Sequence, residues 1–252
     1  MTMFADTKLA IVTGTTSGIG LELAASLLDR GWSVVGLARR DTTIERDGYT
    51  HLRLDLADLD AVRELAERQL APALRRDSLQ RAALVNNAGL IGSLGWLHAA
   101  EPDQLARLFA VNAVAPTYLM GMAAAAAPAT ARLRIVNISS GAAHSAYPGL
   151  GDYGATKAAL RLAGRTLAAE LALSDRPPHT AAVLSYEPGL VDTDMQRQAR
   201  EAPPASFPAH DVFQGFADEG KLAAPQDVVG DIVQFLDSDP AEGFTERRFG
   251  DA

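Results

Sequence analysis

The stretch KLAIVTGTTSGIGLELAASLLDRG, residues 8–31, decides the fold. It opens as a short apolar run that stops at a glycine. It then continues with apolar residues at helical spacing, Ile19, Leu23 and Leu27, until Gly31. A strand that passes through a glycine-rich turn directly into a helix is the opening unit of a βαβ fold. This stretch therefore predicts an α/β protein whose first turn can receive a phosphate group.

Strands and helices continue to alternate along the chain. Further strands are predicted at residues 33–38, 50–55, 82–89, 133–139 and 180–189, and helices at 56–74, 101–127 and 151–173. The strands lack polar alternation, which indicates a parallel sheet covered by helices on both faces. Right-handed crossovers then predict one doubly wound, Rossmann-type domain over residues 1–252, with its ligand site at the carboxyl ends of the strands.

Composition excludes several classes of function. The chain has 252 residues, no cysteine and a net charge of −8. Without cysteine there is no disulfide, no thiol nucleophile and no thiolate-bound metal, and we expect no metal site. The acidic balance argues against nucleic acid or an anionic membrane as a partner. The start has no basic and apolar leader, and the longest apolar run, YLMGMAAAAAPA, is interrupted by glycine and proline, so we expect a cytoplasmic protein without a membrane span.

Residues 190–222 form a long segment with weak periodicity. Pro203, Pro204 and Pro208 would break any long helix within it. A segment of this length in a compact domain is usually a functional lid or disordered, and a plain surface excursion is the alternative. We favour a lid over the substrate site.

The first turn has glycines at Gly14, Gly18 and Gly20, in G-x-x-x-G-x-G spacing. The first permits a tight turn, the second lets the backbone approach a pyrophosphate, and the third lets the helix pack closely on the strand. Exposed N–H groups at the positive end of the helix favour phosphate there. Ordinary turn chemistry is the alternative. The candidate dinucleotide-binding residues of the turn are Gly14, Thr16, Ser17, Gly18, Ile19 and Gly20.

Cofactor preference is read at the end of the second strand. Proteins that bind NAD usually carry an acidic residue there, which binds the ribose 2′-hydroxyl. Here Ala38 is followed by Arg39 and Arg40. Guanidinium groups attract a 2′-phosphate and can pair with it bidentately, so we predict NADP(H) rather than NAD(H). In the alternative interpretation both arginines are solvated surface residues, and Asp41 could pair with one of them.

Two later strand ends supply further candidate contacts to a dinucleotide. Asp55 could accept a hydrogen bond from the adenine amino group, with Leu56 beside it; alternatively, Asp55 is the N-cap of the next helix. The sequence NNAG ends the fourth strand, and its residues Asn87, Ala88 and Gly89 could line the adenine ribose.

Tyr153 and Lys157 are four residues apart in a predicted helix and so share one face. A phenol has a reference pKa of about 10, too high for easy proton exchange at neutral pH. A lysine cation about 4 Å away would contribute on the order of 4 kcal/mol at an effective dielectric near 20. That corresponds to at most about 3 pKa units and would bring the phenol near 7. The pair is a credible acid/base device, although an exposed pair of this spacing occurs by chance in many helices.

Taken together, the motifs resemble the short-chain dehydrogenase/reductase family over essentially the whole chain. In order they are TGxxxGIG at 13–20, NNAG at 86–89, Asn112, NISS at 137–140, YxxxK at 153–157 and PGxxxT at 188–193. In that family the catalytic serine lies thirteen residues before the tyrosine, which selects Ser140 rather than Ser139. Tyr147 has Gly151 four residues on, not a lysine, and is therefore not the acid.

The resemblance implies roles for four catalytic residues. Tyr153 would protonate the carbonyl oxygen, or deprotonate an alcohol in the reverse direction. Lys157 would hold the ribose hydroxyls and lower the phenol pKa. Ser140 would donate to the substrate oxygen, and Asn112 would support a water relay to Lys157. The nicotinamide carries the hydride.

The resemblance also implies a cradle for the carboxamide of the cofactor, formed by Pro188, Gly189, Val191 and Thr193. Two residues depart from common family patterns. Ser17 stands where many NADP-dependent members carry arginine, which puts more weight on Arg39 and Arg40. Glu187 stands where a small or amide residue is more usual, and the sequence offers no physical reason for it.

Within the family, NISSGAA…YPGLGDY and PGLVDTDMQ most resemble the branch that contains sepiapterin and benzil reductases, which reduce a carbonyl with a vicinal carbonyl neighbour using NADPH. His144, Tyr147 and Leu150 are candidates for the substrate wall. Trp96 and Phe213 could close the pocket or serve as ordinary packing. An acidic side chain, Asp194 or Asp251, could anchor a cationic or pterin-like ring.

We therefore expect an NADPH-dependent reductase of a dicarbonyl or pterin-like ketone, acting on a small-molecule carbonyl substrate. One alternative is an NAD(P)-dependent dehydrogenase that oxidises an alcohol. Another is a catalytically idle NADPH-binding sensor. Assembly as a homodimer or homotetramer through helices 105–127 and 151–173 is expected from the family, though both helices could simply cover the sheet.

Overall fold

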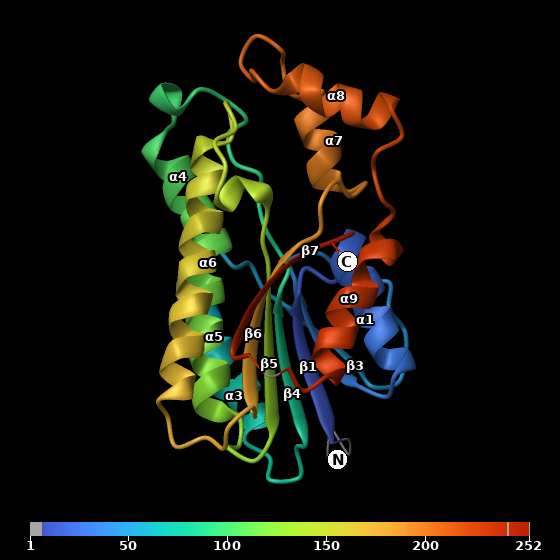
Figure 1. Cartoon of the computed structure of the whole chain (residues 1–252), viewed down its shortest axis with the longest axis vertical. Coiled ribbons are helices and arrows are strands. Elements are labelled where there is room, and N and C mark those ends of the chain that lie inside the picture. The colour runs from blue at the N-terminus through green and yellow to red at the C-terminus, as the bar shows by residue number, and fades with distance from the viewer. Residues whose placement is uncertain (1–6, 241, 252) are drawn as a thin grey trace.

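The computed structural model describes residues 7–240 and 242–251, so the start of the chain, where no leader is expected, lies outside the described residues. The described residues form a seven-stranded, fully parallel sheet in the order β3-β2-β1-β4-β5-β6-β7 (Figure 1). The predicted doubly wound fold is confirmed. The strands are β1 Lys8–Thr13, β2 Ser33–Ala38, β3 Tyr49–Arg53, β4 Arg81–Asn86, β5 Arg132–Ile138, β6 Ala181–Glu187 and β7 Phe244–Arg248.

Helices cover both faces of the sheet, as Figure 1 shows. Helices α1 and α9 pack together on one face, and α3, α5 and α6 lie on the other. The helices are α1 Gly18–Asp29, α2 Leu59–Leu65, α3 Ala71–Leu74, α4 Pro102–Phe109, α5 Ala115–Ala126, α6 Gly151–Ala172, α7 Asp194–Glu201, α8 His210–Asp218 and α9 Pro225–Asp237. Two π-helical turns, Ala66–Leu70 and Ala110–Val114, join α2 to α3 and α4 to α5.

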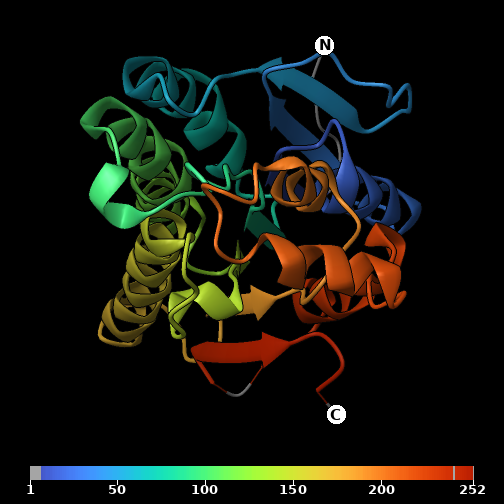
Figure 2. The same cartoon turned by 90° about the horizontal axis from the view of Figure 1, so that it is seen from above.

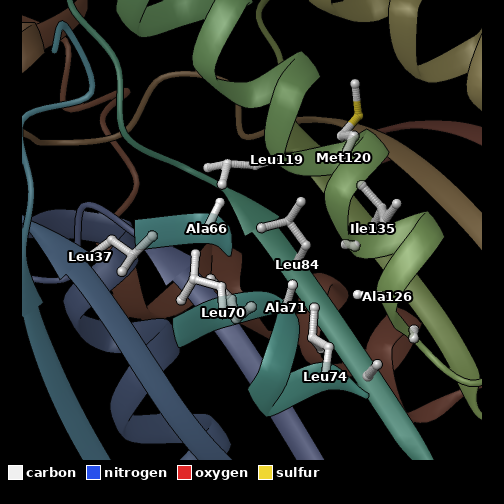
Figure 3. Close-up of a cluster of buried hydrophobic side chains, with 14 of the residues drawn as sticks. Leu37, Ala66, Leu70, Ala71, Leu74, Leu84, Leu119, Met120, Ala126 and Ile135 are labelled. Carbon is white, nitrogen blue, oxygen red and sulfur yellow. The ribbon is translucent and has the colours of Figure 1, made fainter. Parts of the chain in front are cut away.

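Each central strand contributes side chains to two hydrophobic cores, because successive side chains point to opposite faces of the sheet. In β1, Leu9 and Ile11 enter the core under α3, α5 and α6, whereas Ala10 and Val12 enter the core under α1 and α9. Burial of each large aliphatic side chain contributes roughly 1.5–3 kcal/mol. Double-sided burial explains why the strand sequences are apolar throughout. Figure 3 shows part of the first core, around Leu84 of β4.

The sheet order reverses at β1, between β4 on one side and β2 on the other, so the carboxyl ends of these strands open a crevice. Helices α7 and α8 lie over this end of the sheet, as the view from above shows (Figure 2). Both helices belong to the segment 190–222, and they are separated at Pro203 and Pro204. The prolines thus limit helix length as expected, while two short helices still form.

Beyond residue 222 the chain forms two elements that the sequence pattern did not predict, α9 and β7. The buried residues of α9 follow helical spacing, and Val228, Ile232 and Phe235 give a signal that could have found it. Strand β7 has the polar sequence FTERR and lies at the sheet edge, so it shows no hydrophobic pattern.

The continuous helical segment Pro102–Ala126 is long enough to cross a membrane, and its most apolar 18-residue window has a mean hydropathy of 1.4. Half of its most apolar window is buried inside the protein. Its C-terminal part, α5, packs on β4, β5 and α6. Core packing therefore accounts for its apolar character.

Candidate active site

The glycine turn after β1 has the backbone that its sequence requires. Gly14 and Gly18 have φ values of +77° and +57°, in the region that favours glycine. A Cβ on Gly20 would lie 2.3 Å from the carbonyl oxygen of Gly14. The turn is therefore a close-packed cradle, and its open side lines the large cavity described below.

The residues that directly follow β4 form hydrogen bonds with the start of the glycine turn. The Thr13 hydroxyl accepts hydrogen bonds from the backbone N–H groups of Asn87 (3.0 Å) and Ala88 (2.9 Å). The Asn87 amide donates to the carbonyl oxygen of Thr13 at 2.8 Å. The predicted NNAG residues thus lie beside the glycine turn, and Asn87 supports it.

Arg40 reaches back over the glycine turn. Its guanidinium donates to the Ser17 hydroxyl at 2.9 Å and to the Thr16 hydroxyl at 3.4 Å. Its ion pair, at 3.9 Å, is with Asp194 rather than with Asp41. Arg39 and Arg40 both line the cavity. Arg40 therefore borders the glycine turn, and Arg39 lines the same cavity.

Asp55 is not a helix N-cap. The cap of α2 is Asp58, which accepts from the backbone N–H of Ala61 at 3.0 Å. Asp55 accepts instead from the N–H of Ala57 at 3.0 Å and from Arg107 at 3.1 Å. Although burial opposes it, these two donors lower the pKa of the Asp55 carboxyl. Asp55 and Leu56 line the cavity, four and three residues before the helix begins at Leu59.

Asn112 lies in the π-helical turn between α4 and α5 and is 1% exposed. Pro116 lacks the N–H that would bond the Asn112 carbonyl in a regular α-helix. The Asn112 side chain accepts from the Leu90 N–H at 2.8 Å and donates to the Leu90 carbonyl at 2.8 Å and to the Thr156 hydroxyl at 3.1 Å. It therefore ties the loop after β4 to α6, the helix that carries Tyr153.

Tyr153 and Lys157 lie on the buried face of α6, at 7% and 3% exposure. The Lys157 ammonium donates to the carbonyl oxygen of Ile138 at 2.7 Å, at the end of β5. It lies 5.7 Å from the centroid of the Tyr153 ring. The predicted exposed-pair alternative is wrong, because both side chains are buried at the carboxyl end of the sheet.

The expected fall of the Tyr153 pKa toward 7 is also wrong. Burial raises the pKa of Tyr153 to about 12, and hydrogen bonding to the Ser140 hydroxyl opposes this rise. Burial lowers the pKa of Lys157 from 10.5 to about 8. The lysine faces the Ile138 carbonyl, and its distance from the ring leaves desolvation of the phenolate as the dominant effect.

The two adjacent serines have different environments. The Ser140 hydroxyl accepts from the N–H of Ala142 at 3.2 Å and lines the cavity. The backbone N–H of Ser139 donates to the Tyr186 carbonyl at 2.7 Å, which fits its expected role at the strand end. The Ser139 hydroxyl is buried without a partner among the described residues.

One cavity of about 940 Å³ runs from the glycine turn to Tyr153, Lys157 and Ser140. Residues predicted from separate motifs therefore border a single space. Its volume suits a dinucleotide together with a small substrate. The cavity also contains all the predicted carboxamide residues, Pro188, Gly189, Val191 and Thr193, and the predicted wall residues His144, Tyr147 and Leu150.

The two predicted acidic anchors differ in their positions relative to the cavity. Asp194 lines the cavity, but its carboxylate pairs with Arg197 at 2.8 Å and with Arg40 at 3.9 Å, on the side of the glycine turn. Asp251 is not among the lining residues that the structure describes. Phe213 lines the cavity, whereas Trp96 does not and is half-exposed.

Glu187 is the residue for which the sequence alone offered no physical reason. It ends β6, lines the cavity, and accepts a hydrogen bond from the ring of His144 at 2.8 Å. The signal for it was an acidic residue at a strand end directly before Pro188. Its functional interpretation required the fold, because His144 lies 43 residues away in the sequence.

The fold and the site together define a class, the dinucleotide-dependent oxidoreductases, because the phosphate-binding turn shares its cavity with a buried tyrosine, lysine and serine. The family model of the short chain dehydrogenases matches residues 8–204. The chain belongs to the short-chain dehydrogenase family.

Relatives within the family agree with this assignment. The chain is 28% identical to benzil reductase ((S)-benzoin forming) of Bacillus subtilis (strain 168), over 94% of this chain and 96% of that one. It is 34% identical to sepiapterin reductase of Bos taurus, over 77% of this chain and 76% of that one. A solved structure from Beutenbergia cavernae, described as an NAD(P)-dependent gluconate 5-dehydrogenase and holding NADP at low occupancy, is 27% identical and superposes with a TM-score of 0.78 over 98% of this chain and 96% of that one.

Proposed function

We propose that the protein is an NADPH-dependent reductase that converts a ketone with a vicinal carbonyl neighbour into an alcohol. The observation that carries the proposal is the single cavity that joins the phosphate-binding turn to Tyr153, Ser140 and Lys157. A bound NADPH supplies the hydride. The residues of the chain bind the two reactants and provide the proton.

Tyr153 is suited to act as the general acid. Because its pKa is raised to about 12, the phenol keeps its proton throughout the neutral range. As negative charge develops on the carbonyl oxygen, Tyr153 donates its proton and Ser140 donates a hydrogen bond. An alkoxide is more basic than a phenolate, so this proton transfer runs downhill despite the raised pKa.

Lys157 supports the phenol and the cofactor. With its pKa near 8, the ammonium is mostly charged at pH 7 and becomes neutral as the pH rises. Its charge lies 5.7 Å from the centroid of the Tyr153 ring, so it lessens but does not overcome the cost of burying the phenolate left after proton donation. The Nζ atom also lies 3.7 Å from the position that a Cβ of Gly89 would take, beside the NNAG segment that would border the ribose.

The residues of the cavity fit NADPH better than NADH. The backbone of the glycine turn lines the cavity at Gly14 and Gly18, where it could contact a pyrophosphate. Arg40 extends over the hydroxyls of Ser17 and Thr16, where a 2′-phosphate would find a guanidinium and two hydroxyl donors. No acidic side chain follows β2 directly, since Ala38 leads into Arg39.

The substrate preference rests on the relatives and on the cavity wall. Benzil is an aromatic 1,2-diketone, and the wall offers Tyr147, Leu150 and Phe213 to a flat, apolar ligand. Several further apolar side chains, among them Val212 and Phe216, line the same space.

The test is a substrate panel with both cofactors. We expect oxidation of NADPH with benzil, and slower oxidation with a 3-oxoacyl thioester. NADH at the same concentration should support at most about a tenth of the rate, since one charge-assisted hydrogen bond contributes roughly 1.5–3 kcal/mol. A protein that binds NADPH but reduces no member of a wide carbonyl panel would contradict the proposal and favour a sensor.

We also propose that copies of the chain associate through α5 and α6. Apolar side chains are exposed on these helices, including Tyr118 at 38% and Leu162 at 65%. A hydrophobic face of this kind is typical of an interface. Sedimentation analysis should give a dimer or tetramer, and Leu162→Glu should shift it toward the monomer.

A further inference from the structure

The carboxylate of Glu187 lies at the substrate end of the cavity. Glu187 ends β6 and its side chain is 16% exposed. It lines the cavity together with Ser140, His144 and Tyr147, on the side away from the glycine turn. A mostly buried acidic side chain beside a reaction site is costly unless its oxygens are hydrogen-bonded.

One oxygen of this carboxylate is held in place by His144. The Nε2 atom lies 2.8 Å from Oε1 of Glu187, and the Nδ1 atom lies 3.2 Å from the Ser145 hydroxyl. Because an ionised carboxylate only accepts, the imidazole carries its hydrogen on Nε2. His144 therefore fixes the orientation of the carboxylate.

The second oxygen, Oε2, receives no hydrogen bond from the residues that the structure describes. It lies 4.0 Å from the position that a Cβ of Gly141 would take, and the Tyr147 hydroxyl lies 3.3 Å from that same position. Gly141 directly follows Ser140 in the chain. A free acceptor thus lies beside Gly141, the neighbour of the serine that would bind the substrate carbonyl.

Neighbouring cations do not neutralise this acceptor directly. Arg161 of α6 donates two hydrogen bonds to the Glu246 carboxylate of β7, one of them at 2.8 Å. Arg248, opposite Glu187 in the register of β6 and β7, lines the cavity and is exposed. Among the described residues no ion pair within 4.0 Å joins Glu187 to either arginine, so His144 is its only such partner.

We propose that Glu187, oriented by His144, is a specificity-determining residue that accepts a hydrogen bond from a nitrogen donor of the substrate. The substrate class is then a carbonyl compound that carries an N–H or ammonium group several bonds from the reacting carbonyl. A substrate that carries a carboxylate in place of the nitrogen donor would be repelled by Glu187. This inference rests on the proposed function, because it assumes that the carbonyl binds at Ser140 and Tyr153.

The test compares nearly isosteric probes, 4-aminobenzil and 3-aminobenzil against their methyl analogues. Dissociation constants are measured by calorimetry with the protein saturated with NADP⁺, so that no turnover is needed. We expect at least one amino compound to bind about 10-fold or more tighter than its methyl analogue, since hydrogen bonds to a charged group are strong. In Glu187→Gln the preference should fall about fivefold, and in Glu187→Leu it should vanish.

The matched control is Glu201→Gln, which removes an exposed carboxylate of α7 that does not line the cavity and whose ion pair is with Arg197. This variant should still bind the amino compound more tightly than its methyl analogue. A carboxylate probe, 4-carboxybenzil, should bind more weakly than 4-methylbenzil to the wild type and should gain affinity in Glu187→Gln.

The outcomes separate this inference from the proposed function. A wild-type preference below about threefold for both amino compounds, or a preference retained in Glu187→Leu, overturns the inference. Turnover of 4-methylbenzil with NADPH is measured in parallel. If turnover is absent while the Glu187-dependent preference is present, the proposed function fails and the binding role of Glu187 stands.

Discussion

Replacing Lys157 with methionine should remove a pH-dependent cost that burial of this ammonium imposes on folding. The side chain is 3% exposed, and burial lowers its pKa from 10.5 to about 8. A shift of one unit corresponds to about 1.4 kcal/mol, so the cost at low pH is about 3 kcal/mol.

The sign follows from proton binding in the two states. Below pH 8 both states hold the proton, and the full cost is present. Between 8 and 10.5 the unfolded chain holds the proton and the native protein has released it, so native stability rises with pH. The wild type should therefore gain about 2 to 3 kcal/mol relative to Lys157→Met between about pH 7 and pH 10.

The assay is urea unfolding of both proteins without added nucleotide at several pH values in this range. Tyr153, whose pKa is raised to about 12, is present in both proteins, and its contribution largely cancels in the difference. Lys221→Met is the control for the loss of a lysine side chain, because Lys221 is 56% exposed. The free energy of unfolding of the wild type minus that of Lys157→Met should rise with pH. If this difference stays constant within about 0.5 kcal/mol, or falls with pH, the burial argument is refuted.

Three further predictions concern the cofactor and the framework. Arg40→Ala should weaken NADPH binding roughly 10- to 100-fold and leave NADH binding within about twofold, as measured by fluorescence titration; equal losses for both would contradict its role. Gly20→Ala should lower the free energy of unfolding by about 2 kcal/mol, because its Cβ would lie 2.3 Å from the Gly14 oxygen; an unchanged denaturation midpoint would show that the turn can relax. Arg134→Met, at a side chain with 0% exposure, should cost about 3 kcal/mol, whereas Arg132→Met, at 42% exposure, should cost less than about 1 kcal/mol.

Much of the fold could be predicted because the local signals agree with the global architecture. In the first βα unit Gly14 and Gly18 stand where the backbone takes positive φ, and the central strands are apolar because both faces of the sheet are covered. Strand β7 could not be found in this way. Its stability comes from pairing with β6 at the sheet edge, and its residues Thr245, Glu246 and Arg247 do not reveal that pairing.

The candidate site was predictable to the extent that it lies in contiguous motifs. The motifs selected Ser140, Tyr153 and Lys157, and the structure brings these three residues to one cavity. The electrostatics were not predictable, because the distance of Lys157 from the phenol and the desolvation of Tyr153 depend on packing between α6 and β5. The pair of Glu187 with His144 could not be predicted either, since it joins the end of β6 to the loop after β5, and these two segments meet only in the folded protein.

The central claim is that Tyr153 donates the proton in the reduction of a carbonyl. The most direct test is single-turnover reduction of benzil by the NADPH-loaded protein, compared with Tyr153→Phe and with Tyr147→Phe, which removes the neighbouring phenol of the same cavity. We predict that Tyr153→Phe lowers the rate constant at least about 100-fold, and that Tyr147→Phe lowers it less than about 10-fold. A Tyr153→Phe protein that reduces benzil within about 10-fold of the wild-type rate would contradict the account.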